Sequence, residues 1–421
     1  MKRPREVKTL LGQALAIGAI ALVAGCGAET PIGSPTVLFK KDSQHIVPQW
    51  ETRHLARAVC PQVIGKPTCF ALQVLKNGIR PLCSPSGSRG WTAIQIEAAY
   101  SLTGYLAGGS GTNVALIEVG DLAGASSDLA TYRTQYGLGA ANLTKYNENG
   151  KRSNYPPGCG DYDWCVETDL DMDMVSATCP KCNILLIEAK AGVKDLEAAE
   201  ASAVKLGATI VSNSWGCYAS YDCGDPNFPN YFDTPHITYM AATGDTGYGS
   251  LSSPAVLSTV IAVGGTQLEL SGGNYSESIW DDTSAGCADP QNVGGSGVSK
   301  PPWQRDPDCT YRTVGDISAE AGCSPGVVIY VGSGGGWTAA CGTSAASPLT
   351  AGVVALAGDA TGHKAGKTFW SFDSKRHKKY FNHPSGTGYG TCGGYLCGVG
   401  RYKKYYSGPG GWGTPNGIKG Y

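Results

Sequence analysis

The stretch Asn113–Val119 reads NVALIEV, and further along the chain Asn183–Ala189 reads NILLIEA. Both are short apolar runs, which is the pattern of a strand buried on both of its faces. Helices are predicted to follow them, at 126–136 and at 193–206. Strand-length apolar runs that alternate with helices predict an α/β fold, in which a parallel sheet is covered by helices on both faces.

Shorter apolar runs continue this pattern through the middle of the chain. They lie at 208–212, 237–243 and 259–263, and we expect each to add a strand to the sheet. Residues 266–340 are instead rich in glycine, serine and aspartate, and we expect them to form long surface loops. We find no internal repeat.

Length and composition describe a globular, loop-rich protein. The chain has 421 residues, a net charge of −1 and 60 glycines, and only 16% of its residues are charged. It can bury a large core, and its composition excludes a coiled coil or a disordered chain. Its charge provides no strong field that would attract nucleic acid, so no nucleic-acid partner is expected.

The first 25 residues are predicted to be an export signal. A basic start is followed by an apolar run that is short for a membrane-spanning helix and ends in Leu22-Val-Ala-Gly-Cys26. This ending resembles the signal of a bacterial lipoprotein, which would anchor the chain through a lipid on Cys26. The alternative is an ordinary signal cleaved at a small residue. We therefore predict an exported protein, extracellular or at the cell surface, with a short leader at 26–87 and a catalytic domain at 88–421.

Sixteen cysteines agree with an oxidising compartment. Removal of Cys26 from the count leaves an odd number, so that one thiol could remain free. A zinc ribbon at Cys179-Pro-Lys-Cys182 would need a second cysteine pair at suitable spacing, and a redox site there would need to open a helix. Structural disulfides are favoured for the close pairs Cys60/Cys69, Cys159/Cys165, Cys179/Cys182, Cys217/Cys223 and Cys392/Cys397.

A candidate nucleophile lies where a small-residue helix is predicted to begin. Gly342–Pro348 reads GTSAASP and precedes the helical run 349–358. Backbone N–H groups at a helix start favour developing negative charge, so Ser344 suits a nucleophile. The alternative is that Thr343 or Ser344 only caps the helix.

The base for this serine is predicted to be a carboxylate. Glu167 and Asp171 are four residues apart in a helical segment and share a face, and Asp169 and Asp173 form a second such pair. Two carboxyls held together share a proton and raise one pKa, which suits a base at acidic pH. The alternatives are a solvated acidic face or calcium ligands. None of the six histidines has a convincing catalytic context: His45, His54, His236, His363, His377 and His383.

A further acid follows the predicted strand 237–243, in Gly244-Asp245-Thr246-Gly247. Catalytic groups in parallel-sheet proteins gather at the carboxyl ends of strands. A protonated Asp245 at such a place could donate a hydrogen bond to an oxyanion. The alternative is that Asp245 only closes a turn.

Together these motifs resemble the sedolisin, or serine-carboxyl peptidase (peptidase S53), family, and especially its bacterial cysteine-containing branch. The resemblance spans about residues 91–421 and lies in Glu167-x-x-x-Asp171, Gly244–Gly247 and Gly342–Pro348, in that order. Supporting stretches are SNSWG at 212–216, AVGGT at 262–266 and GWGTPNG at 411–417.

The resemblance implies a subtilisin-like fold and a secreted endopeptidase that acts on polypeptides at acidic pH, as a monomer. It implies that Ser344 is the nucleophile and Glu167 the general base. It further implies that Asp171 orients Glu167, and that protonated Asp245 completes the oxyanion hole with the backbone N–H of Ser344.

The chain departs from the family at its calcium site. The family binds calcium through two aspartates and backbone carbonyls, but His383 and Ser407 stand at those two positions. Calcium prefers anionic oxygen ligands, so we expect a weak or absent site and assign no cofactor. A nearby acid such as Asp373 is a possible substitute.

Two alternatives to a peptidase are considered. Gly322–Gly326 matches the G-x-S-x-G pattern of α/β-hydrolases, but a strand-like run follows it where a helix is needed. The stronger alternative is a protease-like surface-binding protein without activity. The loss of the calcium aspartates favours this alternative, and the complete set of Glu167, Asp171, Asp245 and Ser344 argues against it.

Overall fold

The computed structural model describes residues 49–421, apart from positions 54, 64, 77–79, 82–89, 308, 359–364, 387–395 and 397–403. All described residues belong to one compact unit. The predicted export signal and Cys26 lie outside the described residues. Within them, no helix has both the length and the apolar character that a membrane crossing would require.

An eight-stranded sheet forms the centre of this unit and confirms the predicted α/β fold. Its strands run in the order β13-β12-β10-β8-β5-β7-β6, with β16 beside β12. Every pairing is parallel except that of β12 with β13. The strands are β5 (Asn113–Val119), β6 (Asn142–Asn147), β7 (Asn183–Ala189), β8 (Ile210–Asn213), β10 (Thr238–Ala242), β12 (Val260–Ser271), β13 (Asn274–Ile279) and β16 (Ile317–Glu320).

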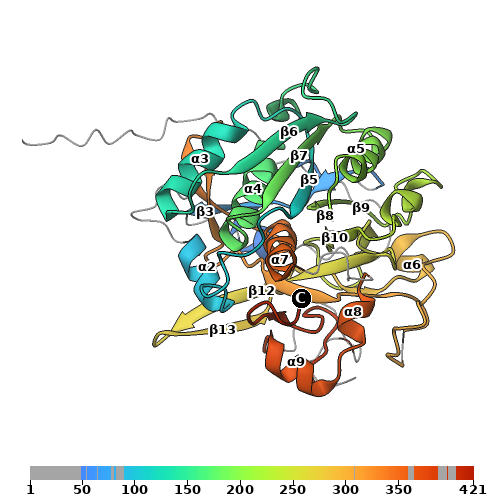
Figure 1. Cartoon of the computed structure of the whole chain (residues 1–421). Helices are drawn as coiled ribbons and strands as arrows, with labels where there is room; N and C mark the ends of the chain where they lie inside the picture. The colour runs from blue at the N-terminus through green and yellow to red at the C-terminus, as the bar shows by residue number, and fades with distance from the viewer. Residues whose placement is uncertain are drawn as a thin grey trace, which may run out of the picture. The chain divides into compact units, whose positions relative to one another are not determined.

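Helices cover the sheet on both faces, because its parallel strands are apolar on both sides. Helices α4 (Cys165–Thr178) and α7 (Thr343–Ala357) pack against each other on one face, together with α2 (Ala93–Ala99) and α3 (Ala125–Tyr136). Helix α5 (Val193–Lys205) packs on β5 and β7 from the other side, as Figure 1 shows.

The contact between α4 and α7 is unusually close at Gly352. A side-chain carbon there would lie 2.0 Å from Thr178 Oγ1. The Thr178 hydroxyl donates a hydrogen bond to the carbonyl of Leu349 (3.0 Å), which ties the two helices together. Glycine at this position therefore brings the start of α7, with Ser344, next to the acidic face of α4.

The prediction of long surface loops at 266–340 is wrong. This region holds the end of β12, all of β13 and β16, and five further short elements, most of them buried. Buried polar residues of this region pair with one another, as Arg312 does in a fully buried ion pair with Asp316, at 2.5 Å between Nη2 and Oδ2. Buried polar pairs of this kind hide strands from a search for apolar runs. The further elements are β14 (Gly286–Cys287), α6 (Pro290–Val293), β15 (Thr313–Val314), β17 (Val327–Val331) and β18 (Gly336–Cys341).

Described residues of the predicted leader lie within the same unit. They form α1 (Gln49–Thr52), β1 (Ala56–Ala58), β2 (Thr68–Cys69), β3 (Leu72–Lys76) and β4 (Arg80–Pro81). Strand β3 pairs with β18, and β2 pairs with β9 (Trp215–Tyr218). The boundary at residue 87 stays a prediction. The remaining elements are η1 (Cys159–Tyr162), η2 (Phe228–Phe232), β11 (Ser252–Ser253), α8 (Lys367–Trp370), α9 (Ser374–Tyr380), β19 (Phe381–Asn382) and β20 (Thr414–Pro415).

Disulfides join four of the predicted cysteine pairs. They are Cys60–Cys69, Cys159–Cys165, Cys179–Cys182 and Cys217–Cys223. The Cys179–Cys182 bond leaves no thiolate there for zinc. Two longer-range bonds, Cys287–Cys309 and Cys323–Cys341, were not predicted, because spacing alone does not reveal them. The predicted pair Cys392/Cys397 lies outside the described residues.

Candidate active site

The candidate residues meet at the carboxyl edge of the sheet. Glu118 is near the end of β5, Ser214 follows β8, and Asp245 follows β10. Parallel strands end at one edge, so these side chains converge there. The first turns of α4 and α7 add Glu167 and Ser344 at the same edge. The structure thus brings together all four residues that the sequence predicted.

The hydroxyl of Ser344 is hydrogen bonded to a carboxylate. Its Oγ donates to Glu167 Oε2 at 3.0 Å and lies 3.1 Å from the carbonyl oxygen of Ser214. Both side chains are buried: Ser344 has no exposed surface and Glu167 is 1% exposed. The Ser–Glu contact is the arrangement in which a carboxylate removes the proton of a nucleophilic hydroxyl.

Asp171 lies one turn further along α4 and is held by a different set of contacts. Its Oδ1 accepts a hydrogen bond from Ser214 Oγ at 2.8 Å, and it shares a hydrogen bond with Glu118. Its influence on Glu167 is the interaction between two carboxyl groups across a buried space. Asp171 therefore lies in the same buried space as Glu167, and Ser214 links it to Ser344 through its hydroxyl and its carbonyl oxygen.

Glu118 is a site residue that the sequence reasoning missed. Its side chain is fully buried, and its Oε2 accepts a hydrogen bond from Trp164 Nε1 at 2.8 Å. Burial raises the pKa of Glu118 to about 8, against the opposing effect of hydrogen bonds from Asp171, Trp164 and Thr168. A lone glutamate inside an otherwise apolar parallel strand was the available signal, because a buried carboxyl needs a partner.

The two carboxyls of α4 favour their protonated forms. Burial raises the pKa of Glu167 well above its usual range, and the charge of Glu118 adds to the effect. Burial likewise raises the pKa of Asp171, followed by the charges of Glu118 and Glu167. Three carboxyls in one dry space cannot all ionise, so they hold shared protons.

Asp245 lies on the other side of Ser344 and contacts the start of α7. Its Oδ1 accepts hydrogen bonds from the backbone N–H and the hydroxyl of Thr343, each at 2.8 Å. Burial raises the pKa of Asp245 to about 8. Its Oδ2 has no hydrogen-bond partner among the described residues. A protonated Asp245 therefore has one donor available beside Ser344.

Gly342 leaves the space into which this donor points. Its φ of +103° is in the region that favours glycine, and a side-chain carbon there would lie 2.5 Å from Asp245 Oδ2. Since α7 begins at Thr343, the N–H of Ser344 belongs to the first turn, where backbone donors lack partners within the helix. A protonated Asp245 and the first backbone N–H groups of α7 are thus hydrogen-bond donors beside the space that Gly342 leaves open.

The second acidic pair of α4 is placed apart from Ser344. Asp173 Oδ2 accepts a hydrogen bond from the backbone N–H of Tyr330 in β17 at 2.9 Å. Asp169 is buried, and after burial the charge of Asp128 is the main cause of its raised pKa. Neither is solvated, so a solvated acidic face is wrong for this helix.

The described histidines and the G-x-S-x-G segment lie elsewhere. His236 is exposed with a φ of +66°, His377 is buried against Phe372 and Trp412, and His383 stacks on Tyr405. Ser324 precedes strand β17 rather than a helix, so the nucleophile elbow is not formed. His45, His54 and His363 lie outside the described residues.

The residues at the expected calcium position do not fit that ion. His383 is half-buried, and its ring stacks on Tyr405 at 4.3 Å between centroids. Ser407 Oγ accepts a hydrogen bond from the N–H of Gly410 at 3.0 Å, and Asp373 caps α9 by accepting one from the N–H of Arg376. Neither His383 nor Ser407 offers a carboxylate, and the Asp373 carboxylate is engaged in capping α9, whereas calcium prefers several anionic oxygens. In the described part of the chain, no cluster of three or more His, Cys, Asp or Glu residues could hold a metal.

Comparison with known proteins supplies a family and a fold. The subtilase family matches residues 162–373, which include α4, Asp245 and the start of α7. A Pseudomonas sedolisin, a serine-carboxyl proteinase complexed with two molecules of pseudo-iodotyrostatin, superposes with a TM-score of 0.65 at 24% identity, over 78% of this chain and 96% of that one. A lanthipeptide protease superposes with a TM-score of 0.49 at 16% identity, over 77% of this chain and 91% of that one. No curated protein sequence matches the chain.

The family match covers half of the chain, and the Pseudomonas sedolisin structure shares its fold. The chain belongs to the subtilase family of serine proteases.

Proposed function

We propose that this protein is an exported serine-carboxyl endopeptidase of the sedolisin type, which hydrolyses polypeptides at acidic pH. The observation that carries the proposal is the 3.0 Å hydrogen bond from Ser344 Oγ to Glu167 Oε2. A carboxylate occupies the place of the base, and no described histidine lies there. Six disulfides among the described residues support an oxidising, extracytoplasmic location.

In the first step, Ser344 Oγ attacks the carbonyl carbon of the substrate while its proton passes to Glu167. The tetrahedral intermediate then collapses, and Glu167 returns the proton to the leaving nitrogen. Water repeats the sequence on the resulting ester and frees Ser344. Asp171 and Glu118 are positioning residues in this scheme, because they hold Glu167 and the shared protons without touching the substrate.

The developing oxyanion would be stabilised by the N–H of Ser344 and by protonated Asp245. Asp245 can donate only while it is protonated, so its raised pKa is part of the mechanism. The pKa of about 8 belongs to a fully buried Asp245, and water that reaches an open site would lower it. We therefore expect maximal activity at acidic pH and loss of activity as the pH rises towards 8. High activity at pH 9 would refute the role of Asp245.

The competing function is a protease-like protein that binds a surface without cleaving it. One assay separates the two: hydrolysis of a denatured protein at pH 3–6, by the wild type and by Ser344→Ala. The proposal predicts hydrolysis that disappears in the variant, because the nucleophile is lost. Equal turnover by the two proteins would refute the scheme, and a folded but inactive wild type would favour the binding protein.

A further inference from the structure

A segment of the chain itself crosses the candidate active site. Strand β2 and the next two residues, Thr68 to Ala71, are here called the cleft segment. Its Phe70 is 2% exposed and Ala71 is fully buried. Because Ser344 and Glu167 are also buried, the cleft segment covers the groups that would receive a substrate.

The cleft segment is bound as an added strand. Thr68 pairs with Gly216 and Cys69 with Trp215, antiparallel to β9. The N–H of Phe70 donates to the carbonyl oxygen of Ser214 at 3.1 Å. The same carbonyl lies 3.1 Å from Ser344 Oγ. Strand addition is a general way for a protein to hold an extended peptide, and here it holds Phe70 next to the nucleophile.

The peptide bond between Phe70 and Ala71 meets the catalytic groups in the order that hydrolysis requires. The N–H of Ala71 donates to Glu167 Oε2 at 2.8 Å, the oxygen that also accepts from Ser344 Oγ. The carbonyl oxygen of Phe70 lies 2.2 Å from the point where a side-chain carbon of Gly342 would be, and Asp245 Oδ2 lies 2.5 Å from that point. The carbonyl oxygen of Phe70 therefore lies beside Asp245, the proposed oxyanion donor. The amide nitrogen of Ala71 is hydrogen bonded to Glu167, the proposed acid for the leaving group.

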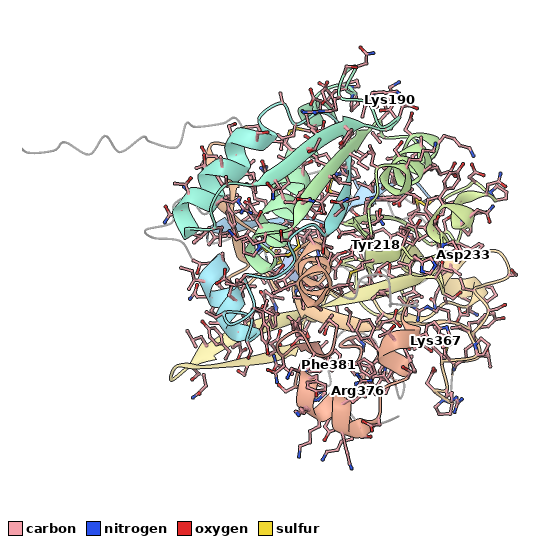
Figure 2. The ribbon with its side chains drawn as sticks, in the orientation of Figure 1. Lys190, Tyr218, Asp233, Lys367, Arg376 and Phe381 are labelled. Atoms are coloured by element: carbon pink, nitrogen blue, oxygen red, sulfur yellow. A yellow bond between two sulfur atoms is a disulfide. The ribbon has the colours of Figure 1, made fainter. Side chains whose placement is uncertain are left out.

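An apolar pocket holds the Phe70 side chain. Its ring packs on Tyr218 at 5.2 Å between centroids, and Phe70, Tyr218 and Ala242 form a separate buried cluster. A side-chain carbon on Gly216 would lie 2.9 Å from Phe70 Cζ, so a larger residue there would fill the pocket. Tyr218 also accepts a hydrogen bond from the N–H of Asp245 at 2.9 Å, and Figure 2 labels it near the middle of the view. The pocket and the oxyanion donor therefore share one wall.

From these contacts, and resting on the proposed function, we infer that Phe70–Ala71 is the first bond this enzyme cuts and that its pocket selects an aromatic residue before the cut bond. Ser344 Oγ forms an ester with the Phe70 carbonyl carbon while the C–N bond breaks, and Glu167 carries the serine proton to the Ala71 nitrogen. One water then hydrolyses the ester, which gives a Phe70 carboxylate, a free amino group on Ala71 and a restored Ser344.

The covalent connections allow the cut segment to leave. Of the six disulfides in the described part of the chain, only Cys60–Cys69 involves this segment, and both cysteines precede the cut. After cleavage the fragment is held by β-pairing of β1 and β2 and by contacts such as Trp50 Nε1 to the Asp245 carbonyl (3.0 Å). After cleavage, the fragment that ends at Phe70 can therefore dissociate from the active site, and a polypeptide substrate can bind in its place.

The first test measures intact mass and amino-terminal sequence of the purified full chain after incubation at pH 4. We expect a new amino terminus at Ala71 in the wild type and in Phe70→Tyr, and none in Ser344→Ala. Phe70→Asp places a carboxyl in the apolar pocket and should slow the cut by about 100-fold or more. A wild type that cleaves a denatured protein but keeps the Phe70–Ala71 bond would overturn this inference alone. A wild type without either reaction would overturn the proposed function.

The second test avoids any effect of Phe70 on folding. Two peptides that span residues 65–76 are supplied to the processed wild-type enzyme, one with Phe and one with Asp at the position of residue 70, both with serine in place of cysteine. We expect cleavage of the Phe peptide after that residue, with kcat/KM about 100-fold above that of the Asp peptide. Equal rates, or cleavage at another bond, would contradict the pocket assignment.

Discussion

Helix α4 carries two acidic pairs with the same spacing and different surroundings. Glu167 and Asp171 face Ser344, Ser214 and Glu118, whereas Asp169 and Asp173 lie away from the serine, with Asp173 accepting the N–H of Tyr330. All four are buried, and burial raises the pKa of each. Perturbed pKa values therefore do not separate a catalytic pair from a structural one. The difference lies in a hydroxyl within hydrogen-bond distance.

The largest difference between the two pairs is expected when the second member of each pair, Asp171 or Asp173, is replaced by asparagine. Asp171→Asn should lower kcat/KM by about 10³–10⁴-fold, because it removes a carboxyl that shares buried protons with the base. Asp173→Asn should keep activity within about threefold, because its contact is with a backbone N–H far from Ser344. Steady-state kinetics of both variants at pH 4 measures this. Equal losses would mean that the two pairs act as one unit.

A second prediction extends the comparison to the acid on the other side of Ser344. Asp245→Ala should lower kcat by about 10²–10³-fold through loss of an oxyanion donor. Asp245→Asn keeps an acceptor for Thr343 and a donor that does not titrate, so its loss should be smaller. A pH profile checks the assignment: the fall of activity at alkaline pH should weaken in Asp245→Asn. An unchanged profile would assign the alkaline limit to another group.

Stability should respond to pH through the buried carboxyls around Ser344. Burial raises the folded-state pKa of Glu118 and Asp245 to about 8 from ordinary values of 4.5 and 3.8. The folded protein therefore binds more protons than the unfolded chain between these values. The stabilising contribution is complete below about pH 4 and is lost as the pH rises to about 8. Melting temperatures should fall by about 5 °C or more from pH 4.5 to pH 8, and a rise would contradict the sign.

The smallest expected effect concerns calcium. Neither the buried carboxyls of α4, which favour their protonated forms, nor the position of His383 and Ser407 provides a suitable cation site. We expect melting temperatures with calcium and with chelator to agree within about 2 °C. A large rise with calcium would show that one of these places holds the ion.

Much of the fold could be predicted because its parallel strands are apolar throughout. NVALIEV and NILLIEA became β5 and β7 with the predicted bounds. The prediction of surface loops at 266–340 failed because most strands there are short. Buried polar groups such as Arg312 and Asp316 lie beside them, and no local sequence pattern reveals that these two residues pair.

The candidate site likewise contains residues that the sequence could predict and residues that it could not. Glu167, Asp171, Asp245 and Ser344 lie in motifs of recognisable spacing, so the sequence could point to them. Glu118 and the cleft segment could not be predicted, because only the tertiary fold places them beside Glu167 and Ser344. Phe70 in particular reads as one more apolar residue until its neighbours are known.

The central claim, that Glu167 is the base for Ser344, is tested most directly by comparing Glu167→Gln with Asp169→Asn. Both variants replace one buried carboxyl of the same helix with an amide of similar size, so each serves as the other's control for effects on folding. The measurement is kcat/KM on the Phe-containing peptide at pH 4, with circular dichroism to confirm the fold. We predict a loss of about 10⁴-fold or more for Glu167→Gln and a change within about threefold for Asp169→Asn. A Glu167→Gln enzyme with near wild-type activity would contradict the account.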